Sequence, residues 1–168
     1  MTAAPLLLAL VSAERIGELW LARRNTAALM AQGAVEMAPQ HYPLIVVLHA
    51  LWLAGLWLLG WSHPVVVGWL FGFLMLQGLR GWVLLTLGRR WTTRIIVLPG
   101  EALVASGPYR FISHPNYVVV VGEIAVLPLC LGLPWFAVVF SLANAVVLMI
   151  RIRAENSALS DMAHVARH

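Results

Sequence analysis

The polar and aromatic side chains that could best bind a ligand are concentrated in residues 106–117, which read Ser-Gly-Pro-Tyr-Arg-Phe-Ile-Ser-His-Pro-Asn-Tyr. The pairs Gly107-Pro108 and His114-Pro115 are typical of turns that leave backbone N–H and C=O groups free for a ligand. The histidine can switch between donor and acceptor, and Tyr109 and Tyr117 offer aromatic faces with hydroxyl groups. A membrane-entry loop with interfacial tyrosines would explain the same residues, so this segment alone leaves both interpretations open.

A second polar group follows the last apolar stretch, where the chain reads Arg151-Ile-Arg-Ala-Glu155-Asn156. Arg151 and Glu155 are four residues apart, so they share one face of a helix and can pair. A guanidinium group also suits bidentate binding of a carboxylate. These two residues are therefore our candidates for a catalytic role, whereas Arg153 is more typical of an arginine that contacts lipid head groups.

Charged residues inside the apolar stretches form a third group. They are Glu14, Arg15, Glu18, Arg80 and Glu123. Ionisable side chains at membrane depth are costly, so they are usually paired or functional. We expect Arg80 to neutralise Glu14 or Glu18, and structural pairing is favoured over direct catalysis. Because Glu123 follows the first polar segment by about two helical turns, it could reach the same pocket, and Glu14, Arg80 and Glu123 are candidate substrate contacts.

These residues must be positioned by membrane helices. Of the 168 residues, 61% are hydrophobic and only 11% are charged. Soluble domains carry about 25% charged residues, so a soluble globular enzyme and a disordered chain are both excluded. The net charge of +4 comes with eleven arginines, no lysine and no long basic run, which argues against a nucleic-acid partner. A single cysteine, Cys130, excludes an internal disulfide and a cysteine-rich metal site, and we expect no metal.

The apolar stretches predict an all-α integral membrane protein with one domain over residues 1–168. A spanning helix needs about 20 apolar residues. The sequence Gly132-Leu133-Pro134 divides the last long apolar stretch, which indicates two helices joined by a tight turn. The five predicted spans cover residues 3–22, 43–61, 65–87, 116–132 and 134–150.

Arginine placement predicts the orientation of these spans. Nine arginines fall in the connections after the first and third spans and in the C-terminal tail, and none falls in the other two connections. By the positive-inside rule, the arginine-bearing side faces the cytoplasm. Five spans then place the N-terminus outside and the C-terminus inside.

The longest connection, residues 88–116, lies on this cytoplasmic side. Two short β-prone pieces, 95–98 and 102–104, flank Pro99-Gly100. They predict a short hairpin or two separate extended pieces.

Three histidines raise the possibility of a haem protein, because paired histidines on membrane helices can ligate haem. His41 and His49 lie at least two turns apart on one predicted helix, and His63 belongs on the opposite side of the membrane from His41. This spacing argues against haem, and hydrogen-bonded packing is the simpler interpretation.

The motif order resembles the isoprenylcysteine carboxyl methyltransferases and their bacterial relatives. The resemblance rests on Gly107-Pro-Tyr-Arg, His114-Pro-Asn-Tyr, Glu123 and Arg151-x-x-x-Glu155. The N-terminal half is similar to one bacterial branch, and the resemblance covers nearly the whole chain. The matching N-terminal pieces are Glu14-Arg15, Ala22-Arg-Arg-Asn25, Gly33-Ala-Val-Glu36, His41-Tyr42-Pro43 and His49. Ser113 stands where the family usually has arginine before His-Pro, and Asn156 stands where it often has a second glutamate.

The resemblance implies S-adenosyl-L-methionine as cofactor, bound at the cytoplasmic face, and a lipophilic acceptor that enters from the bilayer of a bacterial plasma membrane. Membrane lipids are the expected surroundings, and no obligate protein partner is evident. Arg151 would hold a carboxylate of the cofactor or of the acceptor. The acceptor could be an isoprenylcysteine-type carboxylate, a phospholipid amine or a hydroxyl of a lipid-like polyketide. The implied cofactor contacts are Gly107, Tyr109, His114, Pro115, Asn116, Tyr117 and Glu155.

Two other functions stay open on the sequence. A membrane reductase that uses NADPH could share a helical architecture with the sterol reductases, although such enzymes are larger. A small non-enzymatic transporter could line its path with Glu14, Glu18 and Arg80, although transporters usually show repeated halves and this chain shows none.

Overall fold

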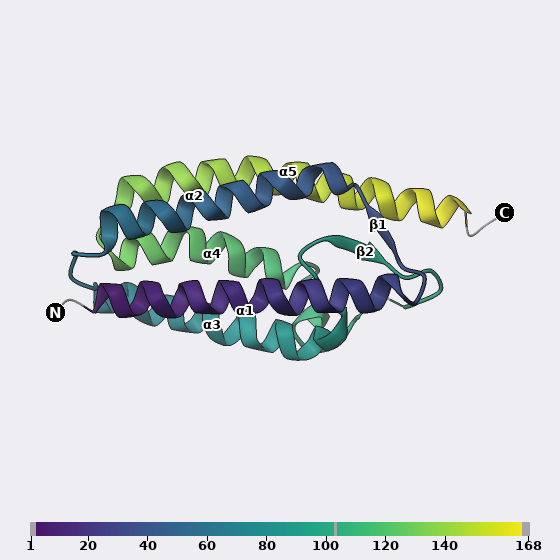
Figure 1. Ribbon diagram of the computed structural model, residues 1–168, viewed down its shortest axis with the longest axis horizontal. Coiled ribbons are helices and arrows are strands. Elements are labelled where there is room, and N and C mark those ends of the chain that lie inside the picture. Colours follow the sequence, from purple (N-terminus) through teal and green to yellow (C-terminus); the bar gives the residue numbers. More distant parts are fainter. Residues whose placement is uncertain (1–2, 103, 166–168) are drawn as a thin grey trace.

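The computed structural model describes residues 3–102 and 104–165, with the side chains of residue 41 and of residues 154–165 left out of the description. Five long helices run side by side along the long axis, and a two-stranded ribbon lies at one end (Figure 1). The fold is therefore all-α apart from this ribbon. In chain order the elements are α1 Ala4–Met30, β1 Val35–Met37, α2 Tyr42–Gly60, α3 Val67–Leu87, β2 Ile95–Val97, α4 Pro115–Cys130 and α5 Pro134–Val165, with short 3₁₀ turns at Pro39–His41, Gly88–Arg90 and Gly107–Arg110.

The five helices lie where the apolar stretches predict them, but the first and last are longer than expected. α1 continues to Met30 and thus contains Arg23 and Arg24, which the apolar pattern predicts in a connection. α5 continues to Val165, although the predicted span ends at residue 150. In the described part of the chain, three segments are long and apolar enough to cross a membrane: Tyr42–Gly60, Val67–Arg90 and Pro134–Arg153. Membrane crossing by α1 and α4 stays a prediction.

The turn predicted at Gly132-Leu133-Pro134 is confirmed. α4 ends at Cys130, Gly132 takes a positive φ of 67°, and α5 begins at Pro134. Proline suits the first position of a helix, where its missing N–H costs nothing, and Pro115 begins α4 in the same way. α4 has 16 residues and is about 24 Å long at 1.5 Å per residue, which is shorter than the hydrocarbon core of a typical bilayer.

Of the two alternatives for residues 95–98 and 102–104, the hairpin is wrong, and a separate extended piece is confirmed at Ile95–Val97. β2 pairs instead with β1, from the connection between α1 and α2, in antiparallel register with Val35 opposite Val97 and Met37 opposite Ile95. An ion pair between Arg94 and Glu36, 2.8 Å apart, extends the pairing beyond the backbone. The ribbon therefore brings two arginine-bearing connections together at one end of the molecule.

The two connections without arginine meet at the opposite end. The backbone N–H of Val66 donates to the carbonyl of Cys130 over 2.8 Å. Nδ1 of His63 lies 2.9 Å from the carbonyl oxygen of Leu131, close enough for a second hydrogen bond. The division of the connections into two groups, predicted from arginine placement, therefore agrees with the fold.

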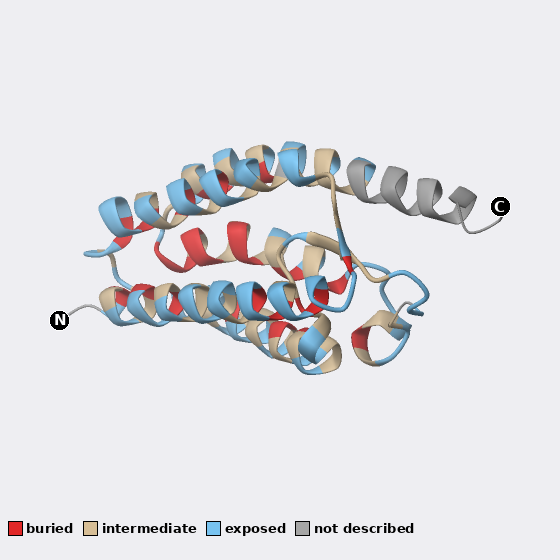
Figure 2. Cartoon of the chain, turned by 45° about the vertical axis from the view of Figure 1, so that its right-hand side comes forward, coloured by how far each residue is buried: buried red, intermediate tan, exposed pale blue. Residues whose placement is uncertain are grey.

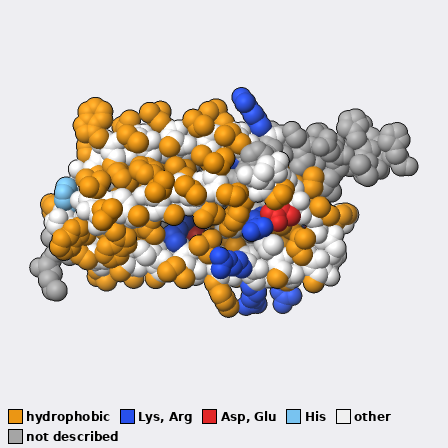
Figure 3. Space-filling view, turned by 45° about the horizontal axis from the view of Figure 1, so that its top comes forward, with side chains coloured by type: hydrophobic (Ala, Val, Ile, Leu, Met, Phe, Trp, Pro, Cys, Tyr) orange, Lys and Arg blue, Asp and Glu red, His pale blue; other side chains and the backbone are white. Residues whose placement is uncertain are grey.

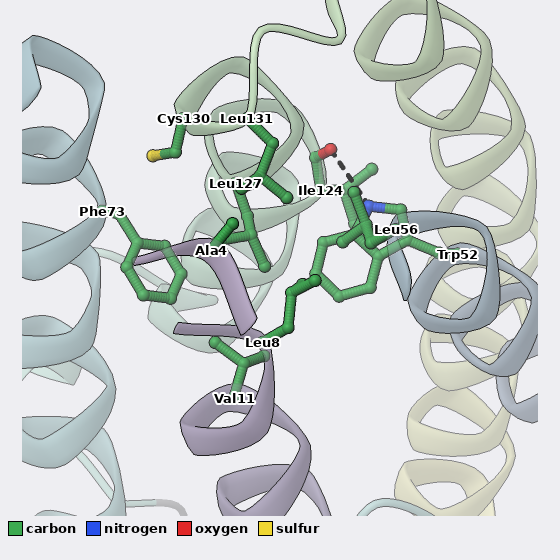
Figure 4. Close-up of a cluster of buried hydrophobic side chains, with 10 residues drawn as sticks. All are labelled: Ala4, Leu8, Val11, Trp52, Leu56, Phe73, Ile124, Leu127, Cys130 and Leu131. Carbon is green, nitrogen blue, oxygen red and sulfur yellow. Dashed lines mark hydrogen bonds between the residues drawn. The ribbon is translucent and has the colours of Figure 1, made fainter. Parts of the chain in front are cut away.

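The apolar core lies between the helices and centres on α4, in which seven of 16 residues are buried (Figure 2). The indole N–H of Trp52 on α2 donates to the carbonyl of Ile124 on α4 over 3.3 Å (Figure 4). Gly122 lets α3 approach closely, because a Cβ at this position would lie 2.7 Å from the side chain of Leu76. The buried cluster contains Ala4, Leu8, Val11, Trp52, Leu56, Phe73, Ile124, Leu127, Cys130 and Leu131.

The outer faces of the helices are also strongly apolar. Leu58 and Leu85 are 77% and 85% exposed, and Trp135 is 81% exposed. Figure 3 shows hydrophobic side chains over most of the visible helical body, whereas charged side chains gather toward the end that carries the ribbon. A soluble monomer rarely exposes so large an apolar surface, and contact with lipid explains it.

Candidate active site

Two pockets lie in the half of the molecule that carries the ribbon, and each has a volume of about 350 Å³. The first lies among the helices and is called the helix pocket. The second lies between the ribbon and the segment that leads into α4, and is called the loop pocket. Ligand pockets of proteins typically hold about 300–1,000 Å³, so both have the size of a small-molecule site.

The helix pocket is lined mainly by apolar side chains of α1, α2, α4 and α5, including Ile16, Ile45 and Val147. Polar or charged side chains of the helices interrupt this lining. They are Ser12, Arg15, Glu18, Tyr42, His49, Arg80, Asn116, Tyr117, Asn144 and Arg151. The pocket therefore suits a largely apolar ligand that carries a polar group.

The loop pocket is more polar. The ribbon strand β2 forms one wall, and Arg90, Arg94 and Glu101 contribute charges. Tyr109 and His114 come from the segment singled out by the sequence. This pocket can therefore contact both the aromatic and the charged parts of a polar ligand.

The two pockets share part of their lining. The residues common to both are Trp91, Thr92, Asn116, Tyr117 and Arg151. Two buried atoms on this shared wall, Trp91 Nε1 and Asn116 Oδ1, have no hydrogen-bond partner in the described part of the chain. The shared wall thus holds a donor and an acceptor between an apolar and a polar pocket.

Arg151 is held in this wall by two elements. Its Nε donates to the hydroxyl of Tyr117 on α4 over 3.1 Å, and its Nη1 donates to the carbonyl of Thr93 over 2.9 Å. The ring of His114 stacks on Tyr117 with centroids 5.0 Å apart. Glu155 lies on α5, but its side chain is outside the described residues, so its predicted pairing with Arg151 and its predicted cofactor contact stay predictions.

The other residues expected to contact the cofactor divide into two groups. Tyr109, His114, Asn116 and Tyr117 line the loop pocket. Gly107 and Pro115 line neither pocket and belong to the turns that position the others. Gly107 has a φ of +58° and packs so closely on Thr86 that an added Cβ would lie 2.9 Å from Thr86 Cγ2.

The charged residues inside the helices form one ion-pair cluster. Nη1 of Arg80 donates to Oε1 of Glu18 over 3.0 Å, and Nε of Arg80 donates to Oε1 of Glu123 over 2.9 Å. Arg15 bonds Glu18 over 2.9 Å, and Glu14 pairs with Arg15 over 3.1 Å. The expected partner of Arg80 is therefore Glu18 rather than Glu14. Glu14 and Glu123 line neither pocket, but they pair with Arg15 and Arg80, which line the helix pocket.

The sequence did not reveal the segment that separates the two pockets. Trp91 and Thr92 follow α3, and Asn25 on α1 holds them. Nδ2 of Asn25 donates to the carbonyl oxygens of Gly88 and Trp91 over 3.0 and 2.9 Å. A buried asparagine in an apolar helix is a signal that a polar partner exists, but it does not say which part of the chain provides one.

The histidines are arranged as packing residues. Nδ1 of His49 bonds the carbonyl of Ile45 at 2.8 Å, one turn earlier on α2. His63 bonds the carbonyl of Leu131 at the opposite end of the molecule. These two histidines do not face each other, and the side chain of His41 is outside the described residues.

Comparison with known proteins identifies the family. The model of the isoprenylcysteine carboxyl methyltransferase (ICMT) family matches residues 66–161. The chain is 40% identical over 163 residues to an uncharacterized protein of Bacillus subtilis, YpbQ, covering 93% of this chain and 96% of that protein. It is 26% identical over 164 residues to an uncharacterized protein of Haemophilus influenzae, covering 92% and 93% of the two chains. No solved structure matches the chain. The matched residues include α4, most of α5 and most of the loop pocket, and the chain belongs to the isoprenylcysteine carboxyl methyltransferase family.

Proposed function

We propose that the protein is an integral membrane methyltransferase that uses S-adenosyl-L-methionine to methylate a lipophilic acceptor. The observation that carries this proposal is the wall shared by the two pockets. A polar pocket beside the loops and an apolar pocket between the helices meet at Asn116, Tyr117 and Arg151. A reaction between a polar cofactor and an apolar acceptor needs this arrangement.

The side chains of the loop pocket fit the proposed cofactor. Arg90 pairs with Glu101 and Arg94 pairs with Glu36. The remaining N–H groups of the two arginines can bind the cofactor's carboxylate, and the carboxylate of Glu101 can also accept from its ammonium group. The face of Tyr109 suits an adenine ring. The unpartnered Trp91 Nε1 and Asn116 Oδ1 offer a donor and an acceptor at the shared wall. When bound, S-adenosyl-L-methionine supplies a methyl group on a positively charged sulfur.

The chain's own residues would orient the reactants and exclude water. Methyl transfer is an in-line displacement, so alignment of the two reactants supplies much of the rate acceleration. Arg151, fixed by Tyr117 and Thr93, can hold a carboxylate at the shared wall. The apolar side chains around the helix pocket keep water from the acceptor.

The acceptor can be a carboxylate, an amine or a hydroxyl. A carboxylate is already ionised and needs no base, whereas a hydroxyl benefits from one. His114 and Glu155 are the candidates, because Glu123 lines neither pocket and is paired with Arg80. Incubation with methyl-labelled cofactor and a total lipid extract, followed by mass spectrometry, would identify the labelled product.

We further propose that the arginine-bearing end faces the cytoplasm of a bacterium, with the N-terminus outside and α1 and α4 within the bilayer. The ribbon and both arginine-bearing connections lie at this end. The orientation places the loop pocket where a water-soluble cofactor is available.

Calorimetric binding of S-adenosylhomocysteine to the detergent-purified protein tests the proposed function. We expect binding to the wild type, and at least tenfold weaker binding to His114→Ala. His63→Ala is the matched control, because His63 lies at the opposite end of the molecule. Absence of binding in several detergents would contradict the proposal, and a thermal shift caused by NADPH instead would favour a reductase.

A further inference from the structure

Four exposed arginines surround the corner of the molecule where α1 and α3 end, which is called the arginine corner. They are Arg23 and Arg24 on α1, Arg89 directly after α3, and Arg110 at the end of the 3₁₀ turn Gly107–Arg110. None of them forms an ion pair with a carboxylate of the described residues. The two glutamates described at this end, Glu36 and Glu101, each pair with another arginine. The positive charge of the corner is therefore not neutralised by the described part of the chain.

The packing of α1 against α3 brings the arginines of these two helices together. Ala22 on α1 and Val83 on α3 belong to one buried cluster, and the helices lie side by side (Figure 1). The amide of Asn25 donates to the carbonyl oxygen of Gly88 over 3.0 Å. Because one arginine directly precedes Asn25 and another directly follows Gly88, two of the four side chains originate close to this bond.

Exposed aromatic side chains lie beside the guanidinium groups. The guanidinium group of Arg24 lies 5.8 Å from the centre of the Trp20 ring, and that of Arg110 lies 5.9 Å from the centre of the Phe111 ring. The rings of Phe111 and Trp82 are 6.5 Å apart, which connects the 3₁₀ turn to the end of α3. All three aromatic side chains are exposed, by 64% at Trp20, 73% at Phe111 and 47% at Trp82. Tryptophan and arginine together are typical of the head-group layer of a bilayer.

The position of the arginines along the helices also fits this layer. Arg24 follows Ala4, at the opposite end of α1, by 20 residues, which is about 30 Å at 1.5 Å per residue. α3 rises by about the same distance from Val67 to Leu87, and Arg89 follows two residues later. The hydrocarbon core of a bilayer is about 30 Å thick. With the opposite helix ends at one membrane surface, the arginine corner therefore lies among the head groups of the other surface.

From this arrangement we propose that the arginine corner binds the phosphate groups of anionic phospholipids. Guanidinium groups donate paired hydrogen bonds to phosphate oxygens, and each arginine at an anionic membrane surface increases the affinity roughly fivefold. Phosphatidylcholine carries the same phosphate, but its choline group cancels the negative charge. A soluble phosphate lacks the apolar part that contacts the exposed rings of Trp82 and Phe111. The inference concerns the outer surface of the protein and does not depend on the proposed function.

Titration of the detergent-purified protein with lipids tests the site. The probes are phosphatidylglycerol and phosphatidylcholine with identical acyl chains, and native mass spectrometry measures the bound lipid. Phosphatidylglycerol should bind at least tenfold more tightly, and the difference should shrink as the ionic strength rises. Equal binding of the two lipids would overturn the proposal. Displacement of phosphatidylglycerol by glycerol 3-phosphate at constant ionic strength would also overturn it, because the site would then take soluble phosphates.

Variants locate the preference. The single variants are Arg23→Gln, Arg24→Gln, Arg89→Gln and Arg110→Gln. Each should weaken binding of phosphatidylglycerol about two- to fivefold, and their combination should abolish the preference. The combination of the four Arg→Lys changes should keep most of it, because the charge is retained.

Arg153→Gln is the matched control, because it removes one exposed arginine from α5 and should change the affinity by less than twofold. Thermal unfolding in detergent checks that the variants fold, and it should be unaffected because the four side chains are exposed and form none of the described ion pairs. An unchanged preference in the glutamine variants would overturn the proposal. An equal loss in Arg153→Gln would also overturn it, because it would indicate a general attraction of positive charge to anionic lipid. Since the assay omits the cofactor, its outcome is independent of S-adenosylhomocysteine binding.

Discussion

Nε of Arg151 on α5 donates a hydrogen bond to the hydroxyl of Tyr117 on α4, and the two atoms are 3.1 Å apart. The same guanidinium group lies 5.7 Å from the centre of the Tyr117 ring and also bonds the carbonyl of Thr93. One side chain thus connects two helices and the segment that separates the pockets. The position of the shared wall depends on this connection.

Replacing Arg151 with glutamine should lower kcat/KM for methyl transfer about 10- to 100-fold. Hydrogen bonds to a charged group contribute about 1.5–3 kcal/mol each, and the variant weakens both of them. The matched control is Arg153→Gln, because Arg153 is exposed on the same helix. A similar loss of activity in both variants would indicate a general effect of positive charge near the membrane.

Replacing Arg80 with methionine should destabilise the protein by about 3–5 kcal/mol, because it leaves Glu18 and Glu123 without their main partner in an apolar region. The double variant Arg80→Met with Glu123→Leu should recover part of this loss, since it removes one unpaired carboxylate. Thermal unfolding in detergent measures both effects. A double variant less stable than Arg80→Met would contradict the assigned pairing.

Replacing Gly107 with alanine should weaken binding of S-adenosylhomocysteine and lower the melting temperature. The residue has a positive φ, and the new methyl group would collide with Thr86. Backbone strain of this kind costs about 1–3 kcal/mol. Gly100→Ala is the control for strain alone, because Gly100 has a φ of +82° but nothing within 4 Å of the added Cβ. Thr86→Ala should partly rescue Gly107→Ala and leave Gly100→Ala unchanged.

Replacing Asn25 with leucine should increase the mobility of the segment around Trp91 and Thr92, which lies between the two pockets. Its amide holds the carbonyl oxygens of Gly88 and Trp91, and these acceptors would lose their partner at a cost of about 1–3 kcal/mol. We expect faster amide hydrogen exchange over residues 88–94. Gln32→Leu is the control, because the only described bond of its side-chain amide is an exposed one to the carbonyl of Ala28, near the end of α1. Unchanged exchange in the Asn25 variant would show that the segment is held by other contacts.

Cysteine labelling tests the orientation. In a Cys130→Ser background, Ser62→Cys should react with a membrane-impermeant maleimide on intact cells. Arg89→Cys should react only after the membrane is permeabilised, because it lies at the arginine-bearing end. The opposite pattern would show that the loop pocket faces outward.

The elements could be predicted largely from local sequence. Apolar stretches of about 20 residues specify membrane helices, and Gly132 followed by Pro134 separates α4 from α5 because both residues break a helix. The C-terminal ends of α1 and α5 could not be predicted from the apolar pattern, because both helices continue into polar residues. The ribbon was missed because three-residue strands carry no periodicity, and β2 found its partner about 60 residues away.

The sequence by itself determined the helical membrane architecture, the gathering of arginines at one end and the polar segment around His114, since these depend on composition and neighbouring residues. Tertiary structure decided which charges pair, so that Arg80 joins Glu18 and Glu123 from two other helices. It also decided that Trp91 and Arg151 share the wall between the two pockets. The physical reason is that buried pairing is set by helix packing in three dimensions, which spacing along a single helix does not specify.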